Sequence, residues 1–278
     1  MTHPSIPAIK SHANPNIRRV MKLRDNRQRR KLQRFLVDGW RETSLALQAG
    51  MELISLYLSV DHHELLVQSD HQTELGMIRK ARETDSLTFV TESIANKIAF
   101  GQSPRGVVAE FVEPASNLAA IRLTSNPLIL ILDQIEKPGN LGAIFRTGDA
   151  AGVDAILLCE STDRFNPNAI RNSQGAVFHV PSACGTQSEI AAFLNHHSII
   201  ARAARVESSD ILWQTDLSKP TAIILGNEAN GLGGRWQEYQ AGPIRGIRIP
   251  MQGKTDSLNV SVTAAIMAME AARQRSVS

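Results

Sequence analysis

Three loops of this 278-residue chain combine glycine, asparagine and charged residues directly after short aliphatic stretches. They span residues 133–147, 226–231 and 249–261. Each follows a stretch that we predict to be a buried strand, and open α/β sheets bind ligands at the carboxyl ends of their strands. We therefore expect the three loops to form one site.

The side chains in these loops suit the recognition of phosphates and hydroxyls. Asn140 is expected to cap the helix that follows, and Arg146 lies on the first turns of that helix, where its planar fork can hold a phosphate. Glu228 can bind a ribose hydroxyl or a basic residue. Ser257 and Asn259 precede the last helix. From spacing alone, each loop also fits an ordinary helix cap or turn, and none contains a P-loop or a G-x-G-x-x-G pattern.

The elements that must position these loops follow from the hydrophobic pattern. Residues 113–127 interrupt that pattern and predict a boundary between domains at 1–115 and 116–278. In the second domain, strands are predicted at 128–132, 155–158, 177–180, 199–203, 222–225 and 246–249, and helices at 141–151, 167–173, 189–195, 232–239 and 260–273. This alternation is typical of a mostly parallel sheet with crossover helices.

The first domain is predicted to be a smaller α/β unit. Its expected helices lie within 18–34, at 39–49 and at 92–99, with a further short helix before the strand at 87–90. The other expected strands lie at 53–60 and 107–112.

Charge is unevenly distributed along the chain. The net charge is +3, but residues 1–41 hold 11 basic and 2 acidic residues, a net of +9, while the remaining 237 residues hold 19 basic and 25 acidic residues, a net of −6. Nine of the seventeen residues at 18–34 are Lys or Arg. Such a basic arm predicts a polyanionic partner, either a nucleic acid or an anionic membrane.

Several classes of protein are not indicated by the sequence. Cys159 and Cys184 are the only cysteines, so a disulfide framework and a structural zinc site are not supported, and a reducing cytoplasm is expected. No apolar stretch approaches the roughly 18 residues of a membrane span. We expect the histidines at 62, 63, 71, 196 and 197 to lie on the surface, without a bound metal.

The order and the residues of the three loops resemble the motifs of the SpoU/TrmH family of RNA ribose 2′-O-methyltransferases, in the SPOUT superfamily. The family motifs N-x-G-x-x-x-R-T, G-x-E-x-x-G and I-P-M-x-G-x-x-x-S-L-N-V-S correspond to residues 140–147, 226–231 and 249–261. Residues 171–178 also look like the family's Ser-x-Gly-Ala stretch. The likeness covers residue 128 to the end of the chain. Residues 35–42 are similar to the opening of the L30e-like substrate-binding domain found in many members.

This resemblance implies a fold, a cofactor and an assembly. The C-terminal domain would be a SPOUT domain whose parallel sheet contains a deep trefoil knot. S-adenosyl-L-methionine would sit in that knot, in a homodimer with the site at the interface, so that Arg146 could act on the partner chain's cofactor. The residues expected to line the cofactor pocket are Leu225, Gly226, Asn227, Ile249, Met251 and Leu258.

The implied reaction is methyl transfer to a ribose 2′-hydroxyl of RNA, with Arg146 as the favoured catalytic residue. A guanidinium stays protonated, so we expect Arg146 to fix a phosphate and stabilise the developing alkoxide rather than act as a base. Asn140, Glu228, Ser257 and Asn259 would orient Arg146 and the target nucleotide. Phosphate contacts are expected from the basic residues Arg18, Arg19, Lys22, Arg24, Arg27, Arg29, Arg30 and Arg41.

The sequence leaves the RNA open. Structured 23S ribosomal RNA is our first expectation, with methylation that confers resistance to thiopeptide antibiotics as one role that the domain plan allows. A tRNA 2′-O-methyltransferase is an alternative. So is a non-catalytic RNA-binding or ribosome-assembly protein that keeps the knot as a scaffold. A nucleotide-dependent hydrolase is disfavoured, because the chain lacks a phosphate loop.

Overall fold

A computed structural model describes residues 6–100, 105–207, 210–239 and 242–276 of the chain. The chain divides into two compact units, and each is described here by itself. The N-terminal unit comprises Met1–Pro114 and the segment Phe165–Ile170. The C-terminal unit comprises Ala115–Arg164 and Arg171–Ser278. Within the described ranges, no helix is long and apolar enough to cross a bilayer.

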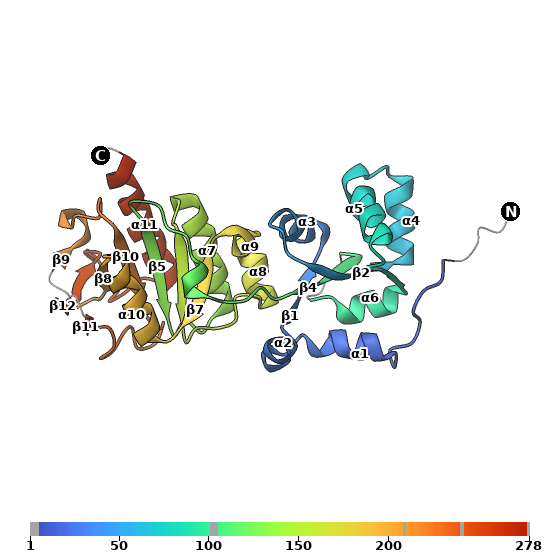
Figure 1. Ribbon diagram of the computed structural model, residues 1–278, viewed down its shortest axis with the longest axis horizontal. Coiled ribbons are helices and arrows are strands. Elements are labelled where there is room, and N and C mark those ends of the chain that lie inside the picture. Colours follow the sequence, from blue (N-terminus) through green and yellow to red (C-terminus); the bar gives the residue numbers. More distant parts are fainter. Residues whose placement is uncertain (1–5, 101–104, 208–209, 240–241, 277–278) are drawn as a thin grey trace. The chain divides into compact units, whose positions relative to one another are not determined.

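The N-terminal unit is built on a four-stranded sheet with the order β1-β4-β2-β3 (Figure 1). The strands are β1 (Arg34–Asp38), β2 (Leu53–Ser59), β3 (Leu87–Val90) and β4 (Val107–Val112). β4 is antiparallel to β1 and β2, whereas β2 and β3 are parallel. The helices are α1 (Pro15–Lys22), α2 (Asn26–Leu32), α3 (Trp40–Gln48), α4 (Val60–Gln68), α5 (Gln72–Glu83) and α6 (Glu92–Ile98). The predicted strands of this unit are confirmed to within one residue.

Helices α1 and α6 cover one face of this sheet. Ile17 and Val20 of α1 are fully buried in a cluster that also contains Leu36 of β1, Tyr57 of β2 and Ile94 of α6. Three apolar positions three residues apart, ending at Leu23, give α1 a single buried stripe. Of the basic residues between these positions, Arg18 and Lys22 are exposed, whereas Arg19 reaches the buried carboxylate of Glu110.

The basic stretch forms two helices rather than the single helix expected from its composition. The chain turns after Lys22, and the side chain of Asp25 accepts a hydrogen bond from the backbone N–H of Gln28, which caps α2. Gln33 ends α2 in the left-handed conformation at φ 51°. Because Asp25 caps a second helix, the chain forms α1 and α2 with a turn between them although the surrounding residues favour one continuous helix.

The C-terminal unit contains a seven-stranded sheet with the order β7-β6-β5-β10-β8-β13-β9. Its strands are β5 (Leu128–Asp133), β6 (Ala155–Cys159), β7 (Ser182–Gly185), β8 (Ile200–Ala204), β9 (Asp210–Ile211), β10 (Thr221–Leu225) and β13 (Arg245–Arg248). Every pairing between neighbouring strands is parallel, which confirms the predicted parallel α/β fold. β10 lies between β5 and β8. The trefoil knot stays a prediction.

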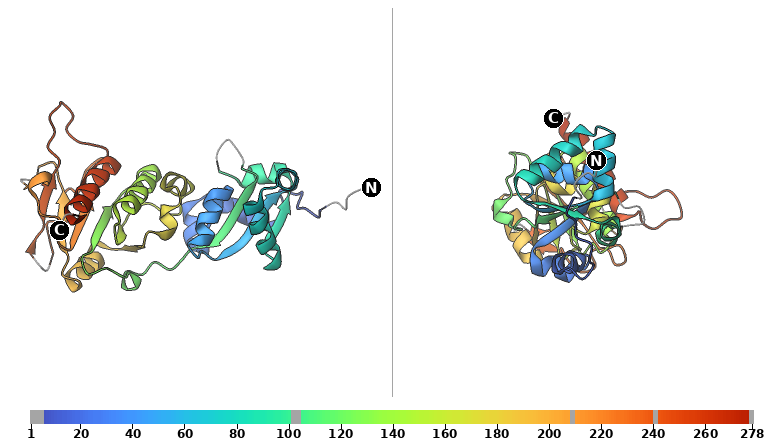
Figure 2. Two further views of the ribbon diagram at one scale, coloured as in Figure 1. Left: turned by 90° about the horizontal axis from the view of Figure 1, so that it is seen from above. Right: turned by 90° about the vertical axis from the view of Figure 1, so that its right-hand side faces the viewer.

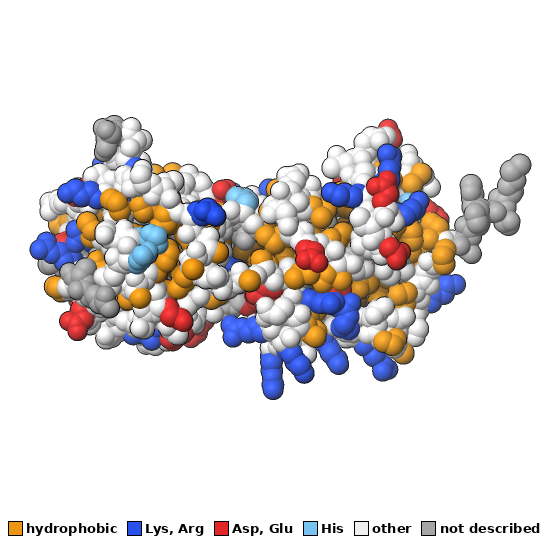
Figure 3. Space-filling view, in the orientation of Figure 1, with side chains coloured by type: hydrophobic (Ala, Val, Ile, Leu, Met, Phe, Trp, Pro, Cys, Tyr) orange, Lys and Arg blue, Asp and Glu red, His pale blue; other side chains and the backbone are white. Residues whose placement is uncertain are grey.

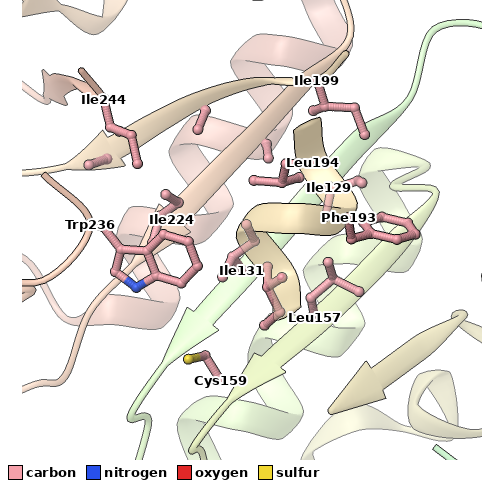
Figure 4. Close-up of a cluster of buried hydrophobic side chains, with 14 of the residues drawn as sticks. Ile129, Ile131, Leu157, Cys159, Phe193, Leu194, Ile199, Ile224, Trp236 and Ile244 are labelled. Atoms are coloured by element: carbon pink, nitrogen blue, oxygen red, sulfur yellow. The ribbon is translucent and has the colours of Figure 1, made fainter. Parts of the chain in front are cut away.

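Helices cover both faces of the larger sheet. They are α7 (Pro138–Ala151), α9 (Ala176–His179), α10 (Gln187–His196) and α11 (Val260–Ser276), whereas the residues of α8 (Pro167–Ser173) are divided between the two units after Ile170. α7 and α11 lie together on one face and α10 on the other, as the left view of Figure 2 shows. On the α10 face, Phe193 and Leu194 pack over Ile131, Leu157 and other aliphatic side chains of the central strands (Figure 4).

Two of the predicted elements in this unit are wrong. Of the strand predicted at residues 177–180, residues 177–179 belong to the short helix α9, which begins after Gly175 in the left-handed conformation, and the strand follows at β7. Residues 232–239 form turns that lead into the short strand β11 (Glu238–Tyr239), which pairs with β12 (Gly242–Pro243). Trp236 is held there at φ 58° and is 1% exposed, so burial of its ring, not helical periodicity, decides the path of the chain.

Candidate functional site

The three polar loops meet at one edge of the larger sheet. β5, β10 and β13 run in the same direction, because β10 is parallel to β5 and to β8, and β8 is parallel to β13. The carboxyl ends of these strands therefore share an edge, and each of the three loops leaves from that edge. α7 and α11, which follow the first and third loops, pack against each other.

One residue from each loop contributes to a hydrogen-bonded polar triad formed by Asn140, Glu228 and Asn259. The Nδ2 of Asn140 donates to Oε1 of Glu228 at 2.7 Å, and the Nδ2 of Asn259 donates to Oδ1 of Asn140 at 3.3 Å. These residues are 88 and 119 positions apart in the sequence. The structure thus brings one residue of each loop together, and their role as a functional site stays a prediction.

Asn259 has a second role at the start of α11. Its Oδ1 accepts hydrogen bonds from the backbone N–H and the hydroxyl of Ser261, at 2.8 and 2.7 Å, so it caps the helix that it precedes. Asn140, by contrast, does not cap α7 as expected. Pro138 occupies the first position of α7, Asn140 lies within the first turn, and its side chain is free to join the triad.

The second loop is folded tightly on itself. Asn227 accepts hydrogen bonds from the backbone N–H groups of Ala229 and Asn230, and its Nδ2 donates to the carbonyl of Gln134 at 3.0 Å. A Cβ at Gly226 would lie 2.4 Å from the backbone of Gly231. Only glycine allows this close approach, which explains the first glycine of the motif.

An ion pair that no pattern in the sequence predicts joins the segment after the second loop to β5. Arg235 donates through Nε and Nη2 to both carboxylate oxygens of Asp133, at 2.9 and 3.0 Å, and Asp133 is 1% exposed. The hydrogen bond with Asp133 raises the pKa of Arg235 above its ordinary value. The two residues are 102 positions apart, and no spacing in the sequence relates them.

Two neighbours of this ion pair complete its surroundings. Arg205, after β8, donates to the carbonyls of Arg235 and Trp236 at 2.6 and 3.1 Å, which supports the loop from its other side. Burial raises the pKa of the Cys159 thiol to about 12, so this cysteine stays a neutral packing residue at physiological pH.

The other predicted site residues differ in exposure. Arg146 and Ser257 are exposed and form no hydrogen bond or ion pair with any described residue. Leu225 is buried, whereas Ile249, Met251 and Leu258 are partly exposed. The structure thus joins Asn140, Glu228 and Asn259 directly and leaves Arg146 and Ser257 open to solvent.

Basic side chains gather over α1 and α2 (Figure 3). Arg18, Lys22, Arg27 and Arg30 are exposed there. Arg24 and Arg41 are exposed too, and Arg24 donates to the carbonyl of Ala99 and lies over the ring of Phe100.

Two of the residues expected to contact phosphates have structural partners instead. Arg29 is 1% exposed and donates to the carbonyls of Leu23 and Arg24 at 2.8 and 2.9 Å, so its expected phosphate contact is wrong. Its guanidinium satisfies carbonyls of the turn that follows α1. Arg19 is engaged in an ion pair with the buried carboxylate of Glu110. The sequence shows that these arginines are charged but does not show which carbonyls and carboxylates they bind.

No candidate metal centre occurs in the described part of the chain, where no three His, Cys, Asp or Glu residues form a group that could hold an ion. The arrangement can instead bind an uncharged or cationic organic ligand through backbone groups, apolar side chains and the carboxylate of Glu228.

Comparison with known proteins tests the family resemblance of the three motifs. Residues 127–269, over half of the 278 residues, match the model of the SpoU rRNA Methylase family, and residues 14–109 match the MRM3-like substrate binding domain. The 23S rRNA guanosine 2′-O-methyltransferase RlmP of Bacillus subtilis is 28% identical over 260 residues, covering 93% of this chain and 96% of that protein.

Two solved structures extend the similarity across both units. A crystal structure described as an RNA 2′-O ribose methyltransferase is 35% identical, with a TM-score of 0.77 over 97% of this chain and 99% of that one. An AdoMet-bound rRNA methyltransferase from Sinorhizobium meliloti is 27% identical, with a TM-score of 0.82 over 96% of this chain and 97% of that one. The chain therefore belongs to the SpoU rRNA methylase family.

Proposed function

We propose that this protein transfers a methyl group from S-adenosyl-L-methionine to a ribose 2′-hydroxyl of 23S ribosomal RNA. The observation that carries the proposal is the polar triad, which joins all three family motifs through side-chain hydrogen bonds. Two relatives that span nearly the whole chain, RlmP of Bacillus subtilis and the Sinorhizobium meliloti protein, are named for this reaction or for rRNA methylation. A scaffold protein has no need to keep the triad and an exposed Arg146 together.

The residues at the shared strand edge fit the cofactor. Partly exposed Ile249, Met251 and Leu258 offer apolar surface for a purine, and the tight turn after Leu225 presents backbone groups. The cofactor supplies a methyl group on a sulfonium, and the carboxylate of Glu228 supplies a negative charge that favours a cation. We propose Leu225, Gly226, Asn227, Ile249, Met251 and Leu258 as the cofactor-binding residues.

Arg146 is proposed as the catalytic residue. Its guanidinium is exposed and has no partner among the described residues, so it is available to an RNA phosphate and to the oxygen on which charge develops. Aligning that oxygen with the methyl carbon supplies much of the rate, and proton removal falls to phosphate or water, because a guanidinium stays protonated. Asn140, Glu228 and Asn259 hold the three loops in register, and Ser257 is proposed to contact the nucleotide.

Arg146→Ala tests this assignment. We expect methylation of 23S rRNA to be abolished while calorimetry still detects S-adenosyl-L-methionine binding. Arg122→Ala, which removes another exposed arginine of the same unit, is the matched control and should leave turnover unchanged. Retained turnover in Arg146→Ala would exclude the catalytic role, and failure of the unmodified protein to bind the cofactor would favour a scaffold.

A homodimer with the site at its interface is part of the proposal. α11 carries apolar side chains on its outer surface: Val262 is 45% exposed, Met269 is 50% exposed, and Ile266 lies between them. Positions 262, 266 and 269 share one helical face, and an unpaired apolar face of this kind is typical of an interface. A second copy of the chain would cover it and bring Arg146 of α7 near a partner's site.

Sedimentation of Met269→Glu tests the dimer. A buried carboxylate should shift the protein toward monomer and lower methylation together. Leu65→Glu is the control, because Leu65 is 57% exposed on α4 of the other unit. An unchanged dimer in Met269→Glu would exclude this face.

RNA is proposed to bind along α1 and α2. Arg18, Lys22, Arg27 and Arg30 are exposed and would bind phosphates, giving affinity without sequence information. Removing one interaction between a basic side chain and a phosphate should reduce the salt dependence of log K by about 0.7–0.9. Charge reversal at Arg27 and Arg30 should therefore flatten that dependence, and an unchanged slope would contradict the role.

Parallel methylation of purified 23S rRNA and tRNA decides the substrate. We expect incorporation into rRNA only, and mapping the modified nucleotide would then show whether the site bears on thiopeptide resistance. We also propose a cytoplasmic location, where ribosomal RNA is processed, and the trefoil knot of the SPOUT fold.

A further inference from the structure

Trp40 and His62 form a flat aromatic pair in the N-terminal unit. The indole Nε1 donates to Nε2 of His62 at 2.9 Å, the ring centroids are 6.2 Å apart, and the ring planes differ by 19°. A hydrogen bond between ring edges at this centroid distance places the rings side by side, nearly coplanar, rather than face to face. Their combined surface is larger than either ring alone.

Backbone geometry holds the aromatic pair in place. Trp40 is the first residue of α3, directly after Gly39 at φ 100°, and His62 lies in the first turn of α4, where its N–H donates to Oγ of Ser59. A Cβ on Gly106 would lie 2.1 Å from Cγ of His62, so the imidazole rests against the backbone at that glycine. Both aromatic side chains remain partly exposed.

A guanidinium paired with Glu42 lies against the backbone of the residue before Trp40. The Arg105 side chain is 45% exposed and is held against Gly39 by an ion pair with Glu42 at 2.9 Å. Arg41, the residue after Trp40, is also exposed. An exposed guanidinium next to a flat aromatic surface suits a nucleotide, whose phosphate and base need both.

The hydrogen bond with Trp40 fixes the protonation state of His62. Its Nε2 accepts a hydrogen bond from the indole N–H of Trp40, so the imidazole is neutral and carries its single proton on Nδ1. Burial lowers the pKa of His62, the charge of His71 lowers it further, and Glu74 opposes both. The neutral form that the aromatic pair requires is thus the form that this environment favours.

We propose that the aromatic pair is a stacking surface for one unpaired base of the RNA substrate. Single-stranded loops and bulges are recognised by stacking their bases on aromatic side chains, histidine included. A coplanar aromatic pair joined by a hydrogen bond, with Arg105 held against the neighbouring Gly39, matches that chemistry, whereas the basic surface of α1 and α2 is proposed for phosphate contacts. The inference rests on the proposed function only in taking RNA as the partner.

The test compares RNA binding by full-length variants. Trp40→Ala should bind a short oligoadenylate between about 5-fold and 150-fold more weakly, the range for loss of one stacked base, and should bind an RNA duplex as before. Trp213→Ala removes a tryptophan that is 52% exposed in the other unit and should leave both affinities unchanged. Equal affinities in the two variants would overturn the proposal.

Fluorescence provides a measurement that does not depend on the folding of Trp40→Ala. The chain has three tryptophans, and in Trp213→Phe only Trp40 is partly exposed, because Trp236 is 1% exposed. Oligoadenylate should quench the emission of Trp213→Phe, and unquenched emission would refute stacking. Methylation of rRNA by a protein that shows no quenching would refute the stacking surface alone, whereas quenching without methylation would refute the enzymatic proposal alone.

Discussion

Replacing Arg235 with Ala tests how the second loop is held against the sheet. The change removes two hydrogen bonds, at 2.9 and 3.0 Å, from a carboxylate that is 1% exposed. Breaking a buried ion pair destabilises a protein by about 3–5 kcal/mol. The Arg235 side chain is 30% exposed, so water reaches the vacated space, and we expect a smaller loss of about 2–3 kcal/mol.

The same variant should bind the cofactor less tightly. Two residues proposed to line the cofactor pocket, Gly226 and Asn227, lie in the second loop, and Arg235 lies shortly after that loop. In Arg235→Ala the hydrogen bond from Asn227 to the carbonyl of Gln134 would still hold the beginning of the loop. Only part of the lost free energy therefore appears in binding. We expect about 1 kcal/mol, or roughly a fivefold higher Kd for S-adenosyl-L-methionine by calorimetry.

Urea unfolding of Arg235→Ala, Asp133→Asn and the double variant measures the pair directly. The two single changes should be strongly non-additive, because each removes the same interaction. Lys219→Ala is the control: its ion pair with Asp216 spans 3.7 Å between side chains 68% and 55% exposed, and should contribute less than about 1 kcal/mol. Additive effects, or a loss in Arg235→Ala no larger than in the control, would refute the reasoning.

Two further predictions concern a glycine and a histidine. Gly226→Ala should lower stability by about 2 kcal/mol or more and weaken cofactor binding, because its Cβ would meet backbone at 2.4 Å, while Gly234→Ala, with nothing within 4 Å, should do neither in the same melts and titrations. Burial and His71 lower the pKa of His62 from 6.5 in the folded protein. The unfolded chain therefore binds a proton at His62 more readily, so the contribution of this residue to the free energy of unfolding should be complete above pH 6.5 and should decrease as the pH falls below 6.5. Urea unfolding across that range checks this, and His62→Gln, which can still accept from Trp40, should lose this part of the pH dependence.

The sequence predicted the parts of the fold that depend on local pattern. Strands such as 107–112, and the helix at 167–173, coincide with the structure because short aliphatic runs and their flanking turns are local signals. The wrong elements lie where distant contacts decide. Residues 232–239 carry no helix because Arg235 is bound to Asp133 and the ring of Trp236 is buried in the core.

The candidate site was likewise predicted in part from the sequence and decided in part by the tertiary structure. The sequence by itself determined the chemical inventory, since the three motifs name Asn140, Glu228 and Asn259 before any contact is known. Only the tertiary structure decided that these side chains bond to one another, because parallel pairing of β5, β10, β8 and β13 brings their loops to one edge.

The basic arm shows the limit of composition most clearly. Its net charge of +9 is a property of the sequence and predicts a polyanionic partner. Which arginines are available to that partner was decided by folding: Arg29 binds carbonyls of the turn after α1, whereas Arg27 and Arg30 remain exposed. Charge is carried by each residue alone, but burial and hydrogen-bond partners exist only once the chain has packed.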